Sequence, residues 1–369
     1  RRCAQGSNLP GGLQQNGVGS STGCLWRPHR WPMTPHGFTI ADPEVAVAAV
    51  PHLLGFRPTH SLVAVWSRAH QVVLTQRVDL PGLDGDIDAF GHRFVELAGR
   101  ALPDSVVCLC FVEAEAEWYP GPLVDALMVA LDAREVELLD VLVVRGDRFE
   151  SALCDGQCCP AGGRTVREAT RQSVSEAFAS LGAQVRSTRG DLVRSLSSDP
   201  DRQREVARHT QELERAFAAA KADGRELEHW RDQQLAQLRG MVAKPRGSRG
   251  HLGGLLVALQ DVRVRDTLMW DLARSDDDRA YLALLEEALV SAPLGLVAPI
   301  ATCYAMLAWF SGDGVRATVA LDRARADVPG YRLAHLLGAA IQAGLPPGEW
   351  RAALASMDES DLRVPTPIA

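Results

Sequence analysis

Three cysteines stand within six residues of one another in the segment C-D-G-Q-C-C-P. They are Cys154, Cys158 and Cys159, and the neighbouring Gly and Pro indicate a turn-rich loop. Three thiolates in one loop could converge on zinc, which normally takes four ligands. The candidates for the fourth ligand are His52, His60 and Asp155. Because the spacing is not a paired C-x-x-C, structural thiols are the favoured interpretation, while a zinc site and a redox-active thiol pair stay open.

A second set of polar residues flanks a predicted pair of strands. Arg77 and Asp79 are two residues apart near the end of the second strand, so their side chains share a face. Open α/β folds bind ligands at the carboxyl edge of the sheet, and residues just before the first strand could approach the same rim. The resulting ligand-binding hypothesis comprises Arg57, His60, Arg77 and Asp79. The simpler explanation of Arg77 and Asp79 is a structural ion pair that orders the turn after them.

Two signatures of common enzyme classes are absent from the sequence. It contains no G-x-x-x-x-G-K-[ST] phosphate loop and no H-E-x-x-H metal helix. Glu113, Glu115 and Glu117 alternate directly after an expected strand and could act as an acid and base pair, but a solvated edge is the favoured interpretation. These observations favour a protein that binds over one that catalyses.

The composition is that of a globular chain. Its 369 residues suit two domains, and its apolar content is 46%. The net charge is −7 and no concentrated basic face is indicated, so we expect no nucleic-acid partner. The short basic stretch K-P-R-G-S-R-G at Lys244–Gly250 is interpreted as a hinge or loop in preference to a nucleic-acid patch. No segment approaches the roughly 20 apolar residues of a membrane span, and no signal peptide is evident. We therefore expect a cytoplasmic protein with reduced thiols and no membrane partner.

The sequence divides into four segments. Residues 1–37 have no helical or strand periodicity and are predicted to be a disordered extension, with translation expected to start at Met33. Residues 38–164 form a predicted α/β domain that ends in the cysteine loop. Residues 165–357 form a predicted helical domain, and residues 358–369 a flexible tail.

Helix and strand signals alternate through the α/β domain. Asp42 can cap the first helix. Ser61–Ser67 and Gln71–Asp79 read as strands joined by a short turn, which predicts a hairpin. Val106–Val112 and Leu138–Val144 are near-continuous apolar runs, typical of strands covered on both faces. We predict a mostly parallel sheet with helices and an antiparallel edge hairpin.

The helical domain contains a segment of tetratricopeptide type. Ala298–Tyr331 has the length of one such repeat, with Gly312 and Asp313 at the turn between two helices. No convincing second copy is present, and stable arrays need about three repeats. We therefore predict a tetratricopeptide-like hairpin within an all-α helical bundle, in preference to a peptide-binding superhelix.

Five segments together resemble the actinobacterial domain-of-unknown-function family 4192. They are P-H-L-L-G-F-R-P-T-H-S-L-V at Pro51–Val63, R-V-D-L-P at Arg77–Pro81, C-x-x-x-C-C-P at Cys154–Pro160, D-V-R-V-R-D at Asp261–Asp266 and the run from Gly312 to Ala334. The resemblance covers the chain from about Ala41 to Trp350. It implies a cytoplasmic actinobacterial protein and brings no activity or cofactor.

The sequence as a whole favours a non-enzymatic binding or regulatory module. Its helical tail would contact a protein partner or a second copy of the chain. One alternative is an enzyme that acts on a small polar substrate at the carboxyl edge of the sheet. Another is a zinc or thiol redox sensor centred on the cysteine loop, and zinc is the one cofactor that the sequence suggests.

Overall fold

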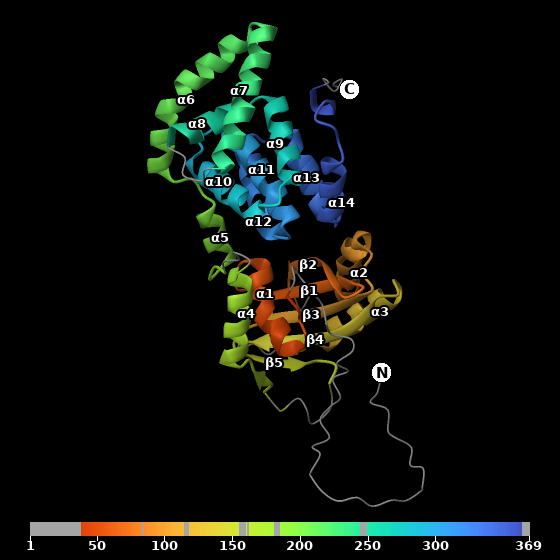
Figure 1. Ribbon diagram of the computed structural model, residues 1–369. Coiled ribbons are helices and arrows are strands. Elements are labelled where there is room, and N and C mark those ends of the chain that lie inside the picture. Colours follow the sequence, from red (N-terminus) through yellow and green to blue (C-terminus); the bar gives the residue numbers. More distant parts are fainter. Residues whose placement is uncertain are drawn as a thin grey trace, which may run out of the picture.

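The structure is a computed structural model that describes residues 38–363, apart from 83–84, 114–117, 155–159, 161, 181–184 and 244–248. Figure 1 shows two parts: a sheet flanked by helices and a bundle of helices, joined through α5 (Arg189–Ser195). The predicted N-terminal extension and the last six residues of the predicted tail lie outside the described residues.

The α/β part contains a six-stranded mixed sheet. Its strands are β1 (Ser61–Arg68), β2 (Gln71–Asp79), β3 (Ser105–Val112), β4 (Glu137–Arg145), β5 (Arg148–Ser151) and β6 (Arg164–Thr165). They lie in the order β2-β1-β3-β4-β5-β6. β3 and β4 are parallel, and the other neighbouring pairs of this sheet are antiparallel. The α/β class is confirmed, but the prediction that the sheet is mostly parallel was wrong.

The strand directions follow from the path of the chain around β1. The chain leaves β2, passes through α2 (Ile87–Ala98) and the 3-10 helix η1 (Gly99–Ala101), and returns as β3 on the other side of β1. β2 and β3 therefore both run antiparallel to β1. All but the last residue of β1 are buried despite these antiparallel neighbours. A continuous apolar run thus shows that helices cover both faces of a strand, and it carries no information on strand direction.

The predicted hairpin at the sheet edge is confirmed. A two-residue turn joins β1 to the edge strand β2. Its residues Ala69 and His70 have φ angles of 49° and 65°, and two left-handed residues are what a turn of this length needs to match the twist of its strands. The backbone N–H of Ala69 donates to Asp104 Oδ2 at 2.6 Å, which ties the turn to the segment just before β3.

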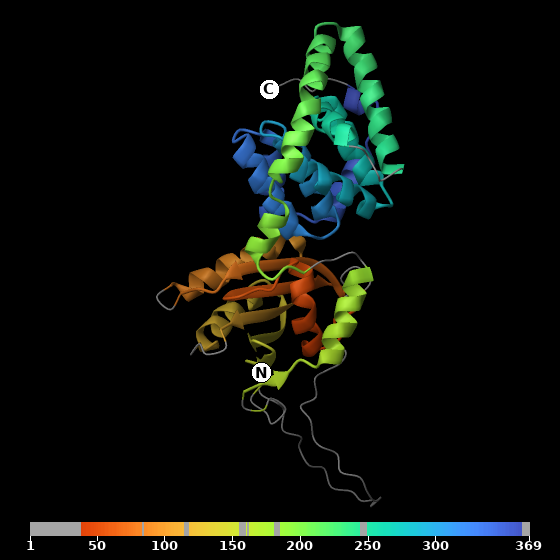
Figure 2. The same ribbon diagram turned by 90° about the vertical axis from the view of Figure 1, so that its left-hand side faces the viewer.

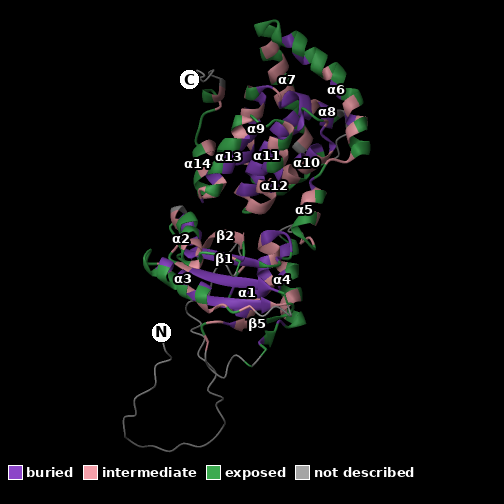
Figure 3. Ribbon diagram, turned by 180° about the vertical axis from the view of Figure 1, so that it is seen from behind, coloured by how far each residue is buried: buried purple, intermediate pink, exposed green. Residues whose placement is uncertain are grey.

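Helices cover both faces of the sheet. α1 (Pro43–Leu54) and α4 (Glu168–Ser180) share one hydrophobic core with Val63 and Val65 of β1. α2 and α3 (Gly121–Asp132) pack on the other face, against Leu62 and Trp66. Figure 3 shows the central strands buried between these layers.

α4 belongs to this first core and not to the helical part. Its Val174 and Phe178 pack in the core that α1 covers. Glu44 of α1 accepts hydrogen bonds from the backbone N–H of Arg167 at 2.8 Å and from Thr170 Oγ at 2.7 Å. The first core therefore extends past residue 165, where we expected the helical domain to begin.

The end of α1 also anchors the connection between the two parts. Gly55 ends the helix in the left-handed region with a φ angle of 73°. Its carbonyl accepts a hydrogen bond from Arg186 N–H at 2.8 Å, and Arg57 N–H donates to the carbonyl of Arg186 at 3.1 Å. The segment just before α5 is thereby fastened to the segment just after α1.

The helical part is built around α11. Its helices are α6 (Pro200–Lys221), α7 (Gly224–Ala243), α8 (Arg249–Ala258), α9 (Val262–Arg274), α10 (Asp278–Ser291), α11 (Val297–Phe310), α12 (Gly314–Asp327), α13 (Arg332–Gln342), α14 (Pro347–Ala355) and the 3-10 helix η2 (Asp361–Arg363). Every residue of α11 except Phe310 is buried, as expected of a helix that is apolar all round. α6 and α7 form a long hairpin that projects from the bundle (Figures 1 and 2).

α11 and α12 form the helical hairpin that the sequence predicts. Gly312 takes a φ angle of 82° in the turn, and Asp313 Oδ1 caps α12 by accepting from Arg316 N–H at 2.9 Å. At the other end, Asp327 Oδ2 accepts from Val297 N–H and Ala298 N–H at 3.0 Å each and so caps α11. The hairpin is confirmed, and its likeness to a tetratricopeptide repeat stays a prediction.

The two parts touch through limited contacts. Within the described ranges, no helix of the helical part packs extensively on a helix or strand of the α/β part. One contact joins the loop after α13 to the end of α2, where a Cβ on Gly344 would lie 2.8 Å from the carbonyl oxygen of Leu97. Val315 of α12 packs against the first core. The described contacts between the two parts are therefore few, and small interfaces between domains of one chain commonly permit relative motion.

Candidate functional site

The structure brings Arg77 and Asp79 together at one end of the sheet. Arg77 Nη2 lies 2.6 Å from Asp79 Oδ1, and Arg77 Nε donates to Ser61 Oγ at 2.9 Å. The strand register places Ser61 opposite both Asp79 and Phe111, so this rim joins the start of β1 to the ends of β2 and β3. The Asp79 side chain is 76% exposed. The pair is thus internally satisfied at the protein surface, as the structural explanation requires.

Arg57 and His60 lie on the same side of the sheet but make different contacts. The carbonyl of His60 accepts a hydrogen bond from Leu80 N–H at 3.2 Å, which places His60 beside the end of β2. Arg57 is bonded through its backbone to Arg186, and its charge acts on His52 of α1. Both side chains are exposed. Only His60 therefore adjoins the Arg77 pair, and a ligand-binding role for these four residues stays a prediction.

The cysteine loop lies mostly outside the described residues. Cys154 is half-buried, and Cys158 and Cys159 fall within the range 155–159 that the structure does not describe. In the described part of the chain, no group of three or more His, Cys, Asp or Glu side chains could hold a metal ion. The zinc and redox predictions for Cys154, Cys158 and Cys159 stay untested.

The buried cysteines elsewhere are chemically inert. Burial raises the pKa of the Cys110 thiol and that of the Cys303 thiol to about 12. The pKa of Cys108 is also raised, by burial first and then by the charges of nearby groups. All three side chains remain protonated at neutral pH and behave as small apolar groups.

A cleft of about 1010 Å³ lies between the α/β part and the helical part. The α/β side contributes the last turn of α1 and Phe178 of α4. The helical side contributes one face of α10, the start of α12 and residues of α11 and α14. The α10 face repeats at every fourth residue, with Asp278, Leu282, Glu286 and Val290. The cleft therefore combines elements that lie more than 200 residues apart in the sequence.

Four polar side chains form what we call the floor cluster: Glu286, Tyr304, Asp313 and Arg316. Tyr304 Oη donates to Glu286 Oε2 at 3.1 Å. Arg316 Nη1 lies 3.5 Å from the same oxygen, and Arg316 Nε lies 3.3 Å from Asp313 Oδ2. One guanidinium is therefore shared by two carboxylates.

The electrostatics of the floor cluster are unusual for surface groups. Burial raises the pKa of Asp313, the charge of Glu286 adds to this, and Arg316 offsets it only in part. About a third of the Asp313 side chain, 31%, remains accessible from the cleft. Burial alone would lower the pKa of Arg316, but Tyr304 and the two carboxylates raise it, so the guanidinium stays charged. Arg316 Nε is buried and has no hydrogen-bond partner among the described residues.

The opposite wall of the cleft is aromatic and uncharged. The ring of His52 stacks on Phe178 with centroids 5.0 Å apart and an angle of 19° between the planes. Burial lowers the pKa of His52, and the charge of Arg57 lowers it further, so the imidazole is neutral at pH 7. His52 Nδ1 is buried and lacks a hydrogen-bond partner in the described structure.

Arg351 holds the rim of the cleft in place. Its Nη1 and Nη2 lie 2.7 and 2.8 Å from the two carboxylate oxygens of Asp278, and its Nε donates to the carbonyl of Ala273 at 3.0 Å. Ser311 Oγ also donates to Asp278, at 3.2 Å. This bidentate pair joins α14 to the start of α10 and leaves little of its charge for a ligand.

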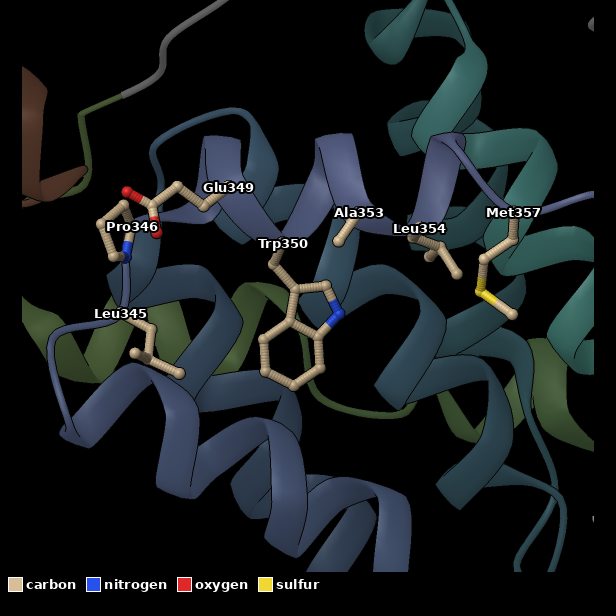
Figure 4. A pocket seen from close by; sticks show the side chains of 7 residues that line it. All are labelled: Leu345, Pro346, Glu349, Trp350, Ala353, Leu354 and Met357. Carbon is tan, nitrogen blue, oxygen red and sulfur yellow. The ribbon is translucent and has the colours of Figure 1, made fainter.

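A second, smaller hollow is apolar and lies on α14. It has a volume of about 400 Å³ and is lined by Leu345, Pro346, Glu349, Trp350, Ala353, Leu354 and Met357 (Figure 4). Trp350 is held from behind by Trp309, whose ring meets it edge-on at 5.4 Å between centroids. We call this hollow the α14 groove.

The family of the chain follows from a match over most of its length. A model described as domain of unknown function (DUF4192) matches residues 43–348. The chain belongs to this family. Two of the segments that carry the family resemblance, Pro51–Val63 and Gly312–Ala334, meet in the cleft through His52 and Asp313. No curated protein and no solved structure matched the chain. Among its described helices, none has the length and apolarity needed to cross a membrane.

Sequence reasoning missed the cleft because its walls come from separate parts of the fold. Asp313 was recognised only as a turn residue, and its cap on α12 explains that role fully. Asp278, Glu286 and Val290 are separated by multiples of four residues, which indicates that they share one face of a helix. This spacing does not show which part of the protein that face contacts. Only the arrangement of the two parts places His52 across from Glu286.

Proposed function

We propose that the protein binds a small polar ligand in the cleft between its two parts. The volume of about 1010 Å³ suits a small molecule, and such sites occur preferentially at domain interfaces. The observation that carries the proposal is the floor cluster, where Asp313 has a raised pKa and one guanidinium serves two carboxylates. Perturbed titratable groups gathered in a cleft are typical of functional sites.

The connection between the two parts supports this proposal. The parts meet through limited contacts near α5 and the loop after α13. Two bodies joined in this way can close on a ligand by a hinge motion. Ligand binding would then fix their relative position, which suits the regulatory role that the sequence favours. The setting that we propose is the cytoplasm of an actinobacterial cell.

We place this function in binding and not in catalysis. Glu286, Tyr304 and Arg316 are engaged with one another, and Arg351 is engaged with Asp278. The enzyme alternative at the sheet rim loses support because Arg77 and Asp79 form an exposed ion pair. The redox and zinc alternatives depend on Cys158 and Cys159 and need metal analysis of the reduced protein.

The α14 groove favours a second candidate function, binding of a protein partner by the helical tail. Its lining is apolar apart from Glu349, and Trp350 is an anchor of the kind that dominates protein interfaces. Ala353 lines the groove, while its neighbour Ala352 is exposed and does not line it. If the groove binds a partner helix, Ala353→Arg abolishes that binding and Ala352→Arg preserves it.

The cleft proposal is tested by ligand-induced stabilisation. Fractions of a small-molecule extract from the source cells are added to the purified chain, and the melting temperature is measured. Ala283 is an exposed residue of α10 that lines the cleft, so Ala283→Trp narrows the cleft without disturbing a core. Ala219, which is exposed on α6 and remote from the cleft lining, provides the control Ala219→Trp.

We expect at least one fraction to raise the melting temperature of the wild-type and Ala219→Trp chains but not that of Ala283→Trp. Small-angle scattering should show a smaller radius of gyration with that fraction. The proposal fails if no fraction stabilises the wild-type chain, or if Ala283→Trp responds as strongly as the wild type.

A further inference from the structure

We infer that the ligand of the cleft is an organic amine, whose ammonium group binds between Glu286 and Asp313. This inference rests on the proposed function and adds the chemical class of the ligand. It depends on a count of charges, a count of hydrogen bonds and the character of the opposite wall.

The charges on the floor of the cleft do not balance. Asp278 is neutralised by its bidentate pair with Arg351. Glu286 and Asp313 share the single charge of Arg316. The floor cluster therefore carries one more negative than positive charge, with Tyr304 protonated because burial and the neighbouring Glu286 raise its pKa.

The remaining charged residues of the lining do not supply this missing cation. Arg202 is exposed and lies 3.4 Å from Asp199, which neutralises it. Arg279 and Glu287 are both exposed residues of α10, and their charges cancel. Arg57 acts on His52 but is not part of the lining. The lining as a whole is balanced, with four arginines and four carboxylates, but among the described residues no ion pair joins Arg202 or Arg279 to the floor cluster. The surplus carboxylate charge is therefore local to the floor.

The carboxylate oxygens of Glu286 and Asp313 can accept further hydrogen bonds. Glu286 Oε2 accepts from Tyr304, and Asp313 Oδ1 accepts from the backbone of Arg316. Among the described residues, no donor forms a hydrogen bond to Glu286 Oε1, and the contact of Asp313 Oδ2 is the ion pair with Arg316 Nε at 3.3 Å. The two side chains are 33% and 31% exposed and line the cleft, so a ligand there can reach both carboxylates. An ammonium group offers three charged donors and no acceptor, and it meets both needs.

The opposite wall of the cleft also suits an amine. His52, Leu53 and Gly55 belong to the last turn and cap of α1, where the helix dipole places partial negative charge. A cation is therefore favoured from this side as well. The stacked rings of His52 and Phe178, together with Leu53, offer an apolar surface for the rest of the ligand. An amine with a hydrophobic body fits both walls at once.

The test uses three probes of similar size: 2-phenylethylamine, 2-phenylethanol and 3-phenylpropanoate. Their dissociation constants for the full chain are measured by titration calorimetry at pH 7.5. A charge-assisted hydrogen bond to a half-buried carboxylate should make the amine bind about tenfold more tightly than the alcohol. The carboxylate probe should bind more weakly than the alcohol.

Isosteric variants locate the ammonium group. Glu286→Gln keeps an acceptor for Tyr304, and Asp313→Asn keeps a helix cap, so both should fold. Each should weaken the amine about tenfold and leave the alcohol unchanged. Glu212→Gln, at an exposed position of α6 outside the cleft lining, is the control and should change the amine affinity by less than about twofold.

The outcomes separate this inference from the proposed function. The inference is overturned if the amine binds no more tightly than the alcohol, which includes the case in which neither binds. It is also overturned if Glu286→Gln and Asp313→Asn leave the amine affinity unchanged. If 3-phenylpropanoate binds tightly and Ala283→Trp abolishes this binding, the ligand is not an amine but the cleft is still the binding site. Probe binding that Ala283→Trp leaves intact would contradict the cleft itself.

Discussion

The sheet rim and the floor of the cleft contain the same chemical groups in different balance. At the rim, Arg77 meets one carboxylate and one hydroxyl, and Asp79 is largely in water. On the floor, Arg316 meets two carboxylates that are mostly withdrawn from water. The rim pair is complete by itself, and the floor cluster needs one more cation. Unequal charge in a cleft therefore points to a ligand more strongly than the mere presence of charged residues does.

The largest effect should come from removing the shared guanidinium. Arg316→Met leaves Glu286 and Asp313 close together without a counter-charge, and we expect a loss of about 4 kcal/mol in the free energy of unfolding at pH 7. At pH 5 the loss should be smaller, because burial raises the pKa of Asp313 and protonation of this carboxyl group relieves the repulsion. Urea unfolding at both pH values measures this. A loss below about 1 kcal/mol would show that Arg316 contributes no more to stability than the exposed ion pair at the rim.

A buried carboxyl group without any cation extends the comparison. Asp140 is 3% exposed, and its Oδ1 accepts from Ser151 Oγ at 2.6 Å and from Val141 N–H at 2.7 Å. Burial raises its pKa from an ordinary 3.8 to about 6, so the folded chain holds this proton more tightly than the unfolded chain. Its contribution to stability is therefore greatest below about pH 3.8 and declines as the pH rises to about 6.

Asp140→Asn should remove that pH dependence. Relative to the variant, the wild-type chain should lose about 2 kcal/mol of unfolding free energy between pH 4 and pH 6.5. Chemical unfolding of both chains across this range measures the difference. Parallel curves for the two chains would mean that Asp140 titrates as it does in water.

Glu44 is the opposite case, a carboxylate with several donors. Burial alone would raise its pKa, but hydrogen bonds from Arg167 and Thr170 and the charge of Arg167 hold it below the ordinary value. Its contribution to stability is therefore present above the unfolded pKa and is lost as the pH falls through the folded one. Glu44→Gln should cost about 1.5 kcal/mol at pH 7, chiefly by loosening α4 from α1. Hydrogen exchange should show faster exchange in α4, and unchanged exchange there would refute this role.

The smallest effect should come from the rim. Arg77→Met should cost at most about 1 kcal/mol, because an exposed ion pair contributes little. It should leave the affinity for 2-phenylethylamine unchanged. A weaker affinity would move the ligand site from the cleft to the rim and revive the sequence-based hypothesis for Arg57, His60, Arg77 and Asp79.

Local features of the fold were predictable because their causes lie close together in the sequence. Strand period and a short turn predicted the β1–β2 hairpin, and Asp42 and Gly55 bound α1 as their capping preferences require. The α11–α12 hairpin follows from Gly312 and Asp313 in its turn. Each of these local features depends on residues within a few positions of one another in the sequence.

Features that depend on distant packing were not predictable. The apolar runs of β1 and β3 predicted that helices cover both faces of these strands. They did not predict that β3 pairs with β1 in the antiparallel direction. The apolar stripe of α4 did not reveal which core would receive Phe178. The floor cluster required α10, α11 and α12 to meet across from α1, so no spacing in the sequence could show it. The sequence therefore indicated the Arg77 and Asp79 pair, whose members are close in sequence, but not the floor cluster, whose members come from three helices.

Calorimetric titration of 2-phenylethylamine into the wild-type, Glu286→Gln and Ala283→Trp chains shows most directly whether an amine binds in the cleft through Glu286. We expect binding to the wild-type chain, about tenfold weaker binding to Glu286→Gln and strongly weakened binding to Ala283→Trp. Equal affinity for all three chains would contradict this expectation, because the amine would then bind without the cleft and without its surplus carboxylate.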